Sequence, residues 1–361
     1  MKNKKNEKSF SRREFLGTTA AAASVFFIPS FFGSEGSVAK QKIAKPNSNF
    51  GGVKVGAITY SWRSMPGGVE NIIKYCRESG ISNIELMSND LEIFLGAPQN
   101  PMAGMMRPPA QQQQQPAQAG QPGQQGQPGA QPGGQRPQRT PEQEAAIAKY
   151  NEELKKWRTS LPISKVEQAR KLFNDAGISV HIVKFSPARW SDEEIDYAFR
   201  VAKAMGAKGV TDEIGEEAVK RLAPFAEKHG MYAIFHNHMQ FATAGFSYDP
   251  FLAVSPAVMM NFDAGHFFGS TGIHPNEILQ KYHDRIFSVH MKDKTGPKST
   301  PPNTNMEWGK GETPVADVLL LIKKQKWPIH VDIELEYPVP EGSDAVKETK
   351  KCVEFMRKIL A

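Results

Sequence analysis

Four side chains of types that commonly bind metal ions stand at the ends of four successive short, β-branched or aromatic segments: His236, Asp263, His290 and Glu334. If these segments are neighbouring strands of one parallel sheet, they lie about 5 Å apart, and their ends can converge on a single cation. Two imidazoles and two carboxylates suit Mn²⁺, Co²⁺, Zn²⁺ or Fe²⁺ better than Ca²⁺. The sequence therefore predicts a site for one divalent metal ion formed by these four residues.

Each of these residues also has a purely structural interpretation. A single histidine at a strand end is more often a core or rim residue, Asp263 can cap a turn before Gly265, and Glu334 can pair with a lysine. Glu336, two residues beyond Glu334 and on the same side of the strand, is a rival ligand. His229 stands at a predicted helix end, where capping is favoured over catalysis. The metal interpretation rests on four such residues at matched positions.

The elements that must position these residues alternate between strand and helix along most of the chain. Eight short segments are predicted as strands, at residues 53–59, 83–87, 178–184, 209–211, 232–236, 259–263, 286–290 and 329–334. Amphipathic segments between them are predicted as helices, at residues 69–79, 165–176, 192–205, 216–229, 275–282, 314–324 and 345–359. The connection after the fifth strand, near residues 248–254, is the least clearly helical.

Eight repeats of strand and helix predict an α/β fold, a (β/α)8 TIM barrel, with the active site at the C-terminal ends of the strands. A doubly wound open sheet is the alternative, but no glycine-rich phosphate-binding motif follows the first strand. After the second strand, residues 97–141 are rich in Gln, Pro and Gly and have almost no apolar side chains, which predicts a disordered insertion. Residues 141–160 are then predicted as a polar helix.

The N-terminal segment has the features of an export signal. The pair Arg12-Arg13 precedes an apolar run and the small residues "SVA", which suit cleavage after Ala39. The run is short for a transmembrane anchor and contains a proline. Residues 1–39 are therefore predicted to be a twin-arginine signal peptide. Residues 40–361 are predicted to form a single exported barrel domain, periplasmic where a periplasm exists, without stable membrane insertion after cleavage.

Most of the basic charge belongs to the N-terminal segment. The chain has a formal net charge of +7, and residues 1–45 contain nine basic and three acidic side chains, which account for +6 of it. The mature protein is then close to neutral, which argues against nucleic acid as a partner. The chain has two cysteines, and neither lies in a spacing typical of a metal site.

Four stretches of the sequence, "NFDAGHFFGSTGIHP", "IFSVHMKDK", "GKGETP" and "VDIELEYP", resemble the sugar phosphate isomerase/epimerase family. These are xylose isomerase-like barrels that include inosose dehydratase, ketose 3-epimerases and the apurinic endonuclease superfamily. The resemblance covers residues 53–360 apart from the Gln-rich insertion. It implies one divalent metal ion held by strands five to eight, usually by Glu, Asp, His and Glu. Asp263, His290 and Glu334 match that set, and His266 falls where the family contacts a substrate hydroxyl.

Strand five departs from the family pattern. Where epimerases have a Glu that is both ligand and base, this chain has His236 in the ligand position, followed by His238, which lines the cavity or supports the ligand. A metal-bound imidazole has already donated its lone pair, so the predicted site has one base fewer than a two-base epimerase. Isomerisation, dehydration and elimination on a keto-sugar need one base and stay open.

The predicted chemistry is proton abstraction next to a carbonyl of a sugar or keto-sugar. A metal ion that binds the carbonyl and the adjacent hydroxyl acidifies the neighbouring C–H and stabilises an enediolate. Either Glu334 or His238 would remove the proton, and Lys292, unless it is a solvated loop residue, would neutralise charge on the oxygen. Glu85 and Trp62 are predicted as polar and stacking contacts to the sugar.

Two other classes of function stay open. A nuclease of the apurinic endonuclease type would need several metal ions and a basic surface for phosphates, which a near-neutral mature chain does not provide. A carbohydrate-binding barrel without catalysis would bind the metal and a sugar but turn nothing over. For an isomerase, a lyase or a carbohydrate-binding barrel, the expected partner is a small-molecule sugar. The sequence does not determine which sugar, which metal or which oligomeric state.

Overall fold

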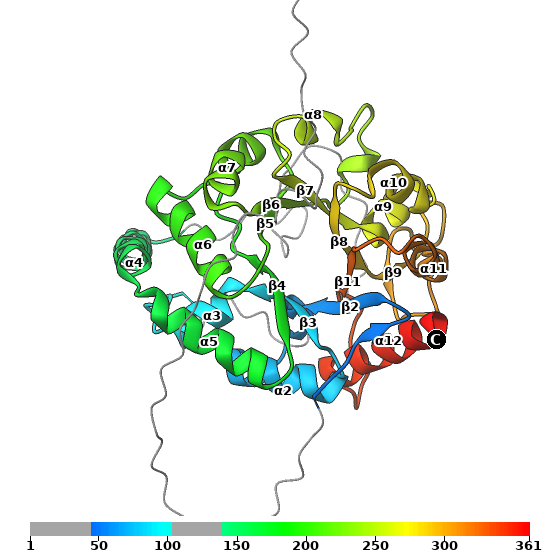
Figure 1. Cartoon of the computed structure of the whole chain (residues 1–361), viewed down its shortest axis with the longest axis horizontal. Coiled ribbons are helices and arrows are strands. Elements are labelled where there is room, and N and C mark those ends of the chain that lie inside the picture. The colour runs from blue at the N-terminus through cyan, green and yellow to red at the C-terminus, as the bar shows by residue number, and fades with distance from the viewer. Residues whose placement is uncertain (1–44, 103–138) are drawn as a thin grey trace, which may run out of the picture. The chain divides into compact units, whose positions relative to one another are not determined.

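The chain folds into a closed barrel of parallel strands surrounded by helices (Figure 1). The computed structural model describes residues 45–102 and 139–361. The barrel strands in chain order are β2 (Val53–Ile58), β3 (Asn83–Met87), β4 (Ser179–Lys184), β5 (Gly209–Glu213), β6 (Tyr232–His236), β7 (Val258–Asp263), β8 (Ile286–Met291) and β11 (His330–Ile333). Each pairs in parallel with the next, and β2 pairs with both β11 and β3, so the sheet closes. The predicted (β/α)8 TIM barrel is confirmed.

Three short strands of the described residues lie outside the barrel. Strand β1 (Asn49–Phe50) pairs antiparallel with the start of β2. Strands β9 (Asp293–Lys294) and β10 (Asn305–Met306) pair antiparallel with each other. Because β9 follows the carboxyl end of β8, this small hairpin lies on the side of the barrel where the active site is expected.

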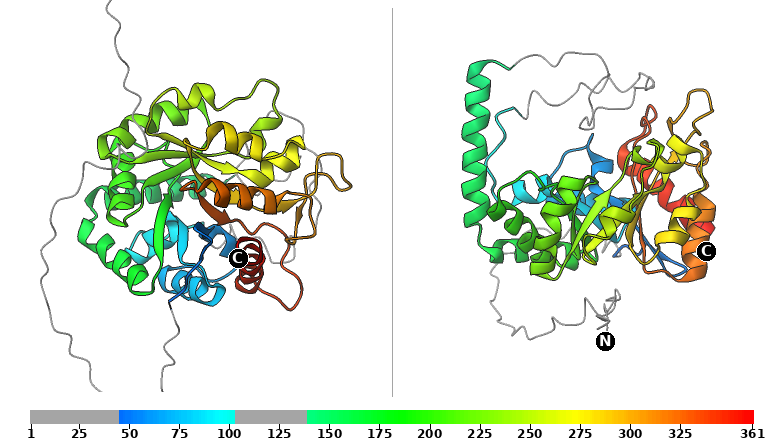
Figure 2. Two further views of the ribbon diagram at one scale, coloured as in Figure 1. Left: turned by 45° about the vertical axis from the view of Figure 1, so that its right-hand side comes forward. Right: turned by 90° about the horizontal axis from the view of Figure 1, so that it is seen from above.

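Helices cover the outside of the barrel (Figures 1 and 2). In the described part of the chain they are α2 (Val69–Ser79), α3 (Ser88–Phe94), α4 (Pro141–Ser160), α5 (Ile163–Asp175), α6 (Asp192–Ala204), α7 (Glu216–His229), α8 (Asp249–Leu252), α9 (Ala264–Thr271), α10 (Asn276–Tyr282), α11 (Val315–Gln325) and α12 (Ala345–Leu360), together with the 3-10 helices η1 (Thr59–Trp62) and η3 (Gln240–Ala242). Helix α9 has no predicted counterpart, because its sequence AGHFFGST contains two glycines and no amphipathic repeat. The poorly defined connection after the fifth barrel strand contains only the four-residue helix α8.

A buried polar pair lies inside the barrel. His181 Nε2 lies 2.8 Å from Asp332 Oδ2, and the His181 ring stacks on His330 with their centroids 4.1 Å apart. A Cβ atom on Gly56 would lie 2.1 Å from Asp332 Oδ1, so only glycine fits opposite this pair. His181 stands near the start of its strand and is accordingly a core residue, not a residue of the barrel mouth.

Helix α4 is attached to the barrel mainly by one arginine. Of its residues, Leu154 and Arg158 are buried, and the opposite end of the helix projects beyond the neighbouring helices (Figure 2, right). The Arg158 guanidinium binds both oxygens of Glu92, at 2.8 and 3.1 Å, and pairs with Glu194 at 3.2 Å. It also lies 3.6 Å from the centroid of the Trp190 ring. A lysine at this position could neither bind both oxygens of the carboxylate nor stack on the aromatic ring in the same way, so the two residue types are not interchangeable here.

Some predictions fall on residues outside the described ranges. The export signal at residues 1–39 lies there, as does most of the insertion at residues 97–141. Within the described ranges, no helix combines the length and the apolar character that crossing a membrane requires.

Replacing Arg158 with Ala is expected to lower the free energy of unfolding by about 3 kcal/mol, because it leaves the buried Glu92 carboxylate without its counter-charge. Urea denaturation followed by circular dichroism measures the change. The matched control is Lys149→Ala on the same helix, which removes only an exposed ion pair and should leave the denaturation midpoint unchanged. Equal midpoints for the two variants would contradict this account of how α4 is held.

Candidate metal centre

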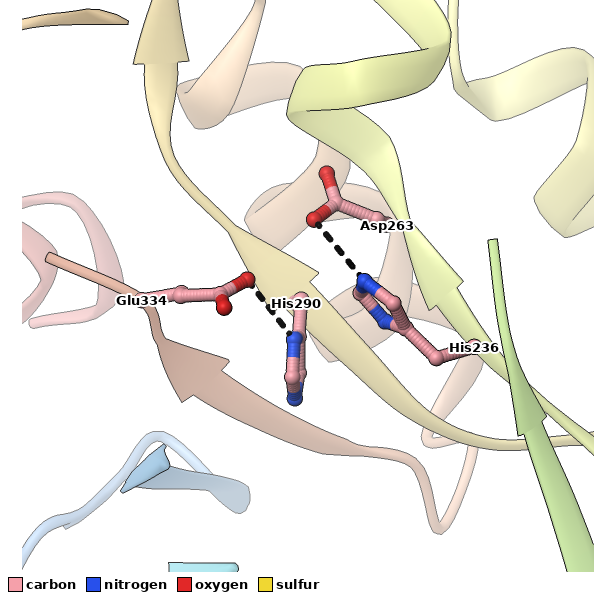
Figure 3. Close-up of side chains that lie close together, drawn as sticks. All are labelled: His236, Asp263, His290 and Glu334. Carbon is pink, nitrogen blue, oxygen red and sulfur yellow. Dashed lines mark hydrogen bonds and ion pairs between the residues drawn. The ribbon is translucent and has the colours of Figure 1, made fainter. Parts of the chain in front are cut away.

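The four residues predicted as metal ligands converge at the carboxyl end of the barrel (Figure 3). They are all buried, and one possible ligand atom from each of His236, Asp263, His290 and Glu334 lies within 4.8 Å of the others. Asp263 and His290 are register neighbours at the ends of β7 and β8. Glu334 follows the last residue of β11 directly. The structure thus brings the whole predicted set together.

Asp263 serves two purposes at the end of β7. Its Oδ1 accepts a hydrogen bond from the His266 backbone N–H at 2.6 Å and so caps helix α9. Its backbone N–H donates to Asn237 Oδ1 at 3.0 Å, which holds the turn in place. Its Oδ2 forms an ion pair with Lys292 Nζ at 2.9 Å and lies 3.9 Å from His236 Nε2, on the side of the other ligand candidates. The capping interpretation and the ligand interpretation of Asp263 are therefore compatible.

His290 is held from both sides by carboxylates. Its Nδ1 lies 3.0 Å from Glu334 Oε2, and its Nε2 lies 2.8 Å from Glu85 Oε2. Glu85 is fully buried in the middle of β3 and also accepts a hydrogen bond from Asn261 Nδ2 at 2.9 Å. A mid-strand side chain points into the barrel below its mouth, so the predicted sugar contact of Glu85 is not supported. Glu85 instead orients His290, as carboxylates commonly do for metal-bound histidines.

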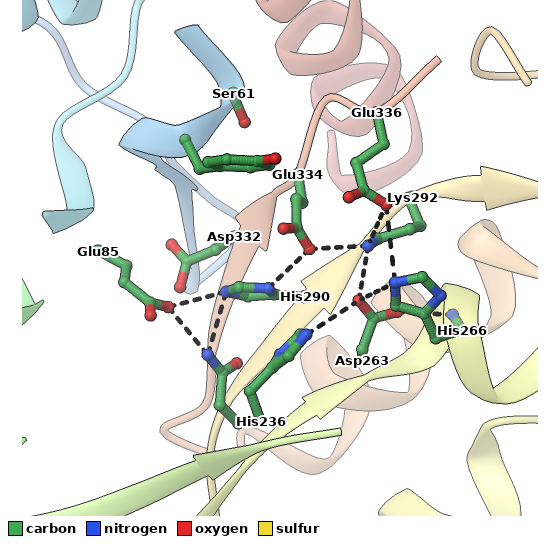
Figure 4. A network of polar contacts seen from close by, with 12 residues as sticks. Ser61, Glu85, His236, Asp263, His266, His290, Lys292, Asp332, Glu334 and Glu336 are labelled. Atoms are coloured by element: carbon green, nitrogen blue, oxygen red, sulfur yellow. Dashed lines mark hydrogen bonds and ion pairs between the residues drawn. The ribbon is translucent and has the colours of Figure 1, made fainter. Parts of the chain in front are cut away.

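Lys292 balances the negative charge of the group (Figure 4). Its side chain is buried, and its Nζ lies 2.9 Å from Asp263 Oδ2, 2.8 Å from Glu334 Oε2 and 2.7 Å from Glu336 Oε2. Burial alone lowers the pKa of Lys292, but the three carboxylates outweigh it and raise that pKa well above the usual value. Lys292 is thus an ion-paired interior residue and not a solvated loop lysine. Glu336, the rival ligand, pairs with it.

The donor set fits a divalent transition-metal ion. Two imidazoles and two carboxylates match the mixed nitrogen and oxygen coordination of Mn²⁺, Co²⁺, Zn²⁺ or Fe²⁺. Burial holds the pKa of His236 well below its usual value, so the imidazole is neutral and its lone pair is available. Burial also raises the pKa of Asp263, as expected for a carboxylate that lacks sufficient nearby positive charge. Burial lowers the pKa of His290, but the carboxylates of Glu334 and Glu85 outweigh burial and raise that pKa well above its usual value, so a cation that binds here must displace a proton from this imidazole.

His238 belongs to a second cluster beside the first. Its Nε2 lies 3.1 Å from Glu213 Oε2, and Lys184 Nζ lies 2.7 Å from Glu213 Oε1. Burial lowers the pKa of His238, but its hydrogen bond to Glu213 and the carboxylate charge outweigh this and raise it. Glu213 lies opposite His236 in the β5–β6 register. Potential ligand atoms of Glu213, His236 and His238 also lie within 4.8 Å of one another.

Glu213 is the site residue that sequence reasoning missed. The fourth strand was predicted to end at residue 211, whereas β5 continues to Glu213. The signal was present in the alternation of the segment "GVTDE", in which Thr211 and Glu213 share a side of the strand. Extending this strand by two residues places a carboxylate at its end, as on strands six and eight.

His266 lies in the first turn of α9 and faces the same region. Its ring centroid is 5.0 Å from that of His238 and 6.4 Å from that of His236. Neither ring nitrogen has a hydrogen-bond partner among the described residues, although the side chain is only 12% exposed. Two unsatisfied nitrogens at the edge of the site agree with the predicted contact to a substrate hydroxyl.

Trp62 does not lie with these residues. Its indole N–H donates to Thr349 Oγ1 on α12 at 3.1 Å, and its ring packs against Tyr75 of α2, so it is buried between the barrel and its helices. The predicted stacking role of Trp62 is therefore wrong. Tyr60, two residues earlier and half-buried, is the aromatic residue of η1 near the site: burial raises its pKa, and so does the negative charge of Glu336.

The motif "HMKDK" connects the centre to a loop. Asp293 Oδ2 accepts hydrogen bonds from the backbone N–H groups of Gly309 at 2.8 Å and Gly311 at 2.9 Å, and its Oδ1 accepts one from Thr313 at 3.2 Å. A Cβ atom on Gly311 would lie 2.2 Å from Asp293 Oδ1, so the approach requires glycine. The segment "GKGETP" is thereby tied to the strand that carries His290.

Comparison with known proteins identifies the same architecture. A sequence profile described as "Xylose isomerase-like TIM barrel" matches residues 152–359. A xylose isomerase domain protein from Alicyclobacillus acidocaldarius has a similar structure, with a TM-score of 0.53 and 12% identity over 85% of this chain and 99% of that chain. A probable 3-DHS dehydratase involved in petrobactin synthesis from Bacillus anthracis has a TM-score of 0.51 and 14% identity, over 84% and 98%.

An uncharacterized protein from Parabacteroides distasonis has a TM-score of 0.50 and 20% identity, over 85% of this chain and 99% of that chain. At these identities the likeness concerns the fold. No curated protein matches the chain.

Purified protein reconstituted with Mn²⁺, Co²⁺, Zn²⁺ or Fe²⁺ is expected to retain about one ion per chain, because the four-residue group forms one coordination site. Elemental analysis after gel filtration measures this. His236→Ala should lose the ion, whereas His274→Ala, which removes a half-exposed histidine paired with Asp317, should retain it. No bound ion after reconstitution would contradict the metal centre, and about three ions would favour the nuclease alternative.

Glu85→Gln is expected to weaken metal binding about 10- to 100-fold without abolishing it, because the variant loses the charged acceptor that orients His290. Competition with a fluorescent chelator measures the affinity. Glu312→Gln, a change of the same kind on an exposed side chain, is the control. Unchanged affinity in Glu85→Gln would show that Glu85 does not support the ligand.

Proposed function

Because the chain belongs to the xylose isomerase-like TIM barrel family and combines a buried ligand group with an adjacent histidine–carboxylate pair, we propose that it is a metal-dependent enzyme of the isomerase/epimerase type. Its substrate is a sugar or keto-sugar, and the reaction begins with removal of a proton from the carbon next to a carbonyl. The observation that carries the proposal is the position of His238: it is next to the four-residue group but not part of it.

His236, Asp263, His290 and Glu334 are the residues that would hold the metal ion. The ion supplies Lewis-acid polarisation of a carbonyl and its adjacent hydroxyl when it is bound. The protein keeps the four side chains buried, which excludes water and strengthens each electrostatic interaction among them. Lys292, between three carboxylates, keeps the total charge of the site from becoming strongly negative.

His238 is a better base than Glu334. The Glu334 carboxylate is engaged by His290 and Lys292; burial raises its pKa, but these positive neighbours outweigh burial and hold the pKa well below the usual value. His238 is 38% exposed, and its Nε2 faces Glu213. When Nε2–H donates to that carboxylate, Nδ1 keeps its lone pair and can accept a proton from the substrate. Glu213 in turn is held by Lys184.

Elimination on a keto-sugar or keto-glycoside, a lyase or dehydratase reaction, is the second candidate function. It is favoured by His236, which stands where a two-base epimerase would have a Glu and leaves the site with one clear base. His266 has a side chain that is 12% exposed, and neither of its buried ring nitrogens has a hydrogen-bond partner among the described residues, which suits a contact to a hydroxyl of the substrate. The probable 3-DHS dehydratase shares this fold, and its name belongs to the same class of reaction.

Two wider alternatives have less support. A nuclease would need a basic surface and further ligands, and the charged residues that gather at this centre are mostly carboxylates. A carbohydrate-binding barrel without catalysis would have no use for the His238–Glu213 pair. Export through the twin-arginine route is part of the proposal, and it favours a free sugar or glycoside as the small-molecule partner.

His238→Gln is expected to reduce the exchange of carbon-bound hydrogen in keto-sugars with deuterated water about 10²- to 10⁴-fold, because it removes the base and keeps the ligands. Proton NMR of a panel of keto-hexoses and 3-keto-glycosides in deuterated buffer measures the exchange, and the products distinguish isomerisation from elimination.

The control variant is His274→Gln, which changes a histidine of similar exposure, 40%, that is also paired with a carboxylate. Its exchange rate should equal that of the wild type, and both variants should keep the metal ion. Exchange that survives in His238→Gln would show that another residue is the base. Metal binding without exchange on any compound of the panel would favour the non-catalytic barrel.

A further inference from the structure

Lys294 is a buried lysine that the proposed mechanism does not use. It lies in β9, two residues after Lys292, and its side chain is 3% exposed. Its Nζ donates a hydrogen bond to the Asn305 side-chain oxygen at 3.0 Å. Among the residues that the structure describes, no carboxylate forms an ion pair with it, whereas Lys292 has three such partners and Lys184 has Glu213. Burying an ammonium group without a counter-charge is unfavourable.

Two glycines of α9 place this ammonium beside the metal centre. A Cβ atom on Gly265 would lie 2.2 Å from Lys292 Cγ, and one on Gly269 would lie 2.8 Å from Lys294 Cε. The two positions are four residues apart and therefore share a face of the helix. The two lysine side chains thus cross the same face of α9 side by side, next to the turn that carries His266.

Neighbouring charged groups act on the Lys294 ammonium. Burial and the charge of Lys292 lower the pKa of Lys294 to about 8, while Glu336 and Asp263 act in the opposite direction. Lys294 also contributes to lowering the pKa of His266, after burial and Lys292. The ammonium is therefore close enough to influence the site and is mostly protonated at neutral pH. The nearest carboxylates are already taken up by Lys292.

Unsatisfied polar atoms lie beside this ammonium. Asn303 Oδ1 has no hydrogen-bond partner among the described residues, and it would lie 2.3 Å from a Cβ atom on Gly269, next to Lys294 Cε. Both ring nitrogens of His266 are also unsatisfied. A cation without a counter-ion, an amide oxygen and two imidazole nitrogens form a suitable set for a ligand with hydroxyls and one anionic group.

We propose that Lys294 binds an anionic substituent of the substrate, a carboxylate or a phosphate, so that the enzyme prefers an acidic sugar to a neutral one. This inference rests on the proposed function, since it places the anion on the substrate of the same site. The His266 nitrogens would bind hydroxyls between the anionic group and the metal centre. Lys292 cannot take this role, because three carboxylates already surround it.

Isothermal titration calorimetry of the metal-loaded full chain with D-glucose, D-glucuronate and D-glucose 6-phosphate tests the proposal. At least one of the two acids is expected to bind about tenfold or more tightly than glucose, which corresponds to about 1.4 kcal/mol. Whichever acid has the advantage identifies carboxylate or phosphate as the preferred group. Lys294→Met should abolish the advantage, and Lys298→Met, which changes an exposed lysine of the neighbouring loop, should keep it.

The proposal is overturned if neither acid binds more tightly than glucose, or if Lys294→Met retains the preference. Met replaces the buried charge with an apolar side chain of similar length, so the variant should fold. Gly269→Ala is the second variant: it keeps the lysine but displaces its Cε, and it should weaken binding of the acid selectively.

Metal content and hydrogen exchange on a neutral keto-sugar separate this inference from the proposed function. Both should be unchanged in Lys294→Met. A wild-type protein that prefers the acid but neither binds metal nor catalyses exchange would reject the proposed function alone. One that catalyses exchange without preferring the acid would reject this inference alone.

Discussion

Carboxylates buried at the mouth of a barrel must have positive charge close by, and the structure of the site depends on how this requirement is met. Asp263, Glu334 and Glu336 surround the single ammonium of Lys292, while Glu85 and Glu334 lie on either side of His290. Lys292 and His290, whose pKa these carboxylates raise well above its usual value, still leave the carboxylates in excess, and a divalent cation among the buried ligands would offset the remaining negative charge. The same requirement makes Lys294 exceptional, because it is a buried cation that forms no ion pair with a carboxylate of the described residues.

Secondary structure and coordination use the same residues at this centre. Asp263 caps α9 with one oxygen and faces the ligand group with the other. Asp293, between two lysines of the same motif, fastens the glycine-containing loop to the strand end. A change at either aspartate therefore alters the fold of the barrel mouth together with its chemistry.

On strand five, His236 stands where the family resemblance would place a carboxylate, and this difference changes which reactions the site can catalyse. In the proposed mechanism the imidazole is a ligand and not a base, and a carboxylate lies on the neighbouring strand, at Glu213, where it pairs with His238. The proposed mechanism thereby separates proton abstraction from metal binding. This division of tasks is compatible with isomerisation and with elimination, and the nature of the leaving group decides between them.

The sequence by itself determined the barrel and its four convergent residues, since strand and helix patterns are local and the C-terminal ends of parallel strands meet at one side. Only the tertiary structure decided which side chains contact each other across strands. Glu85 contacts His290, Trp62 packs against α12, and Glu213 pairs with His238. Each of these contacts depends on the stagger between barrel strands and on residues far away in the chain. Local patterns carry no information about such contacts, so they identified the strand ends but not the partners of each side chain.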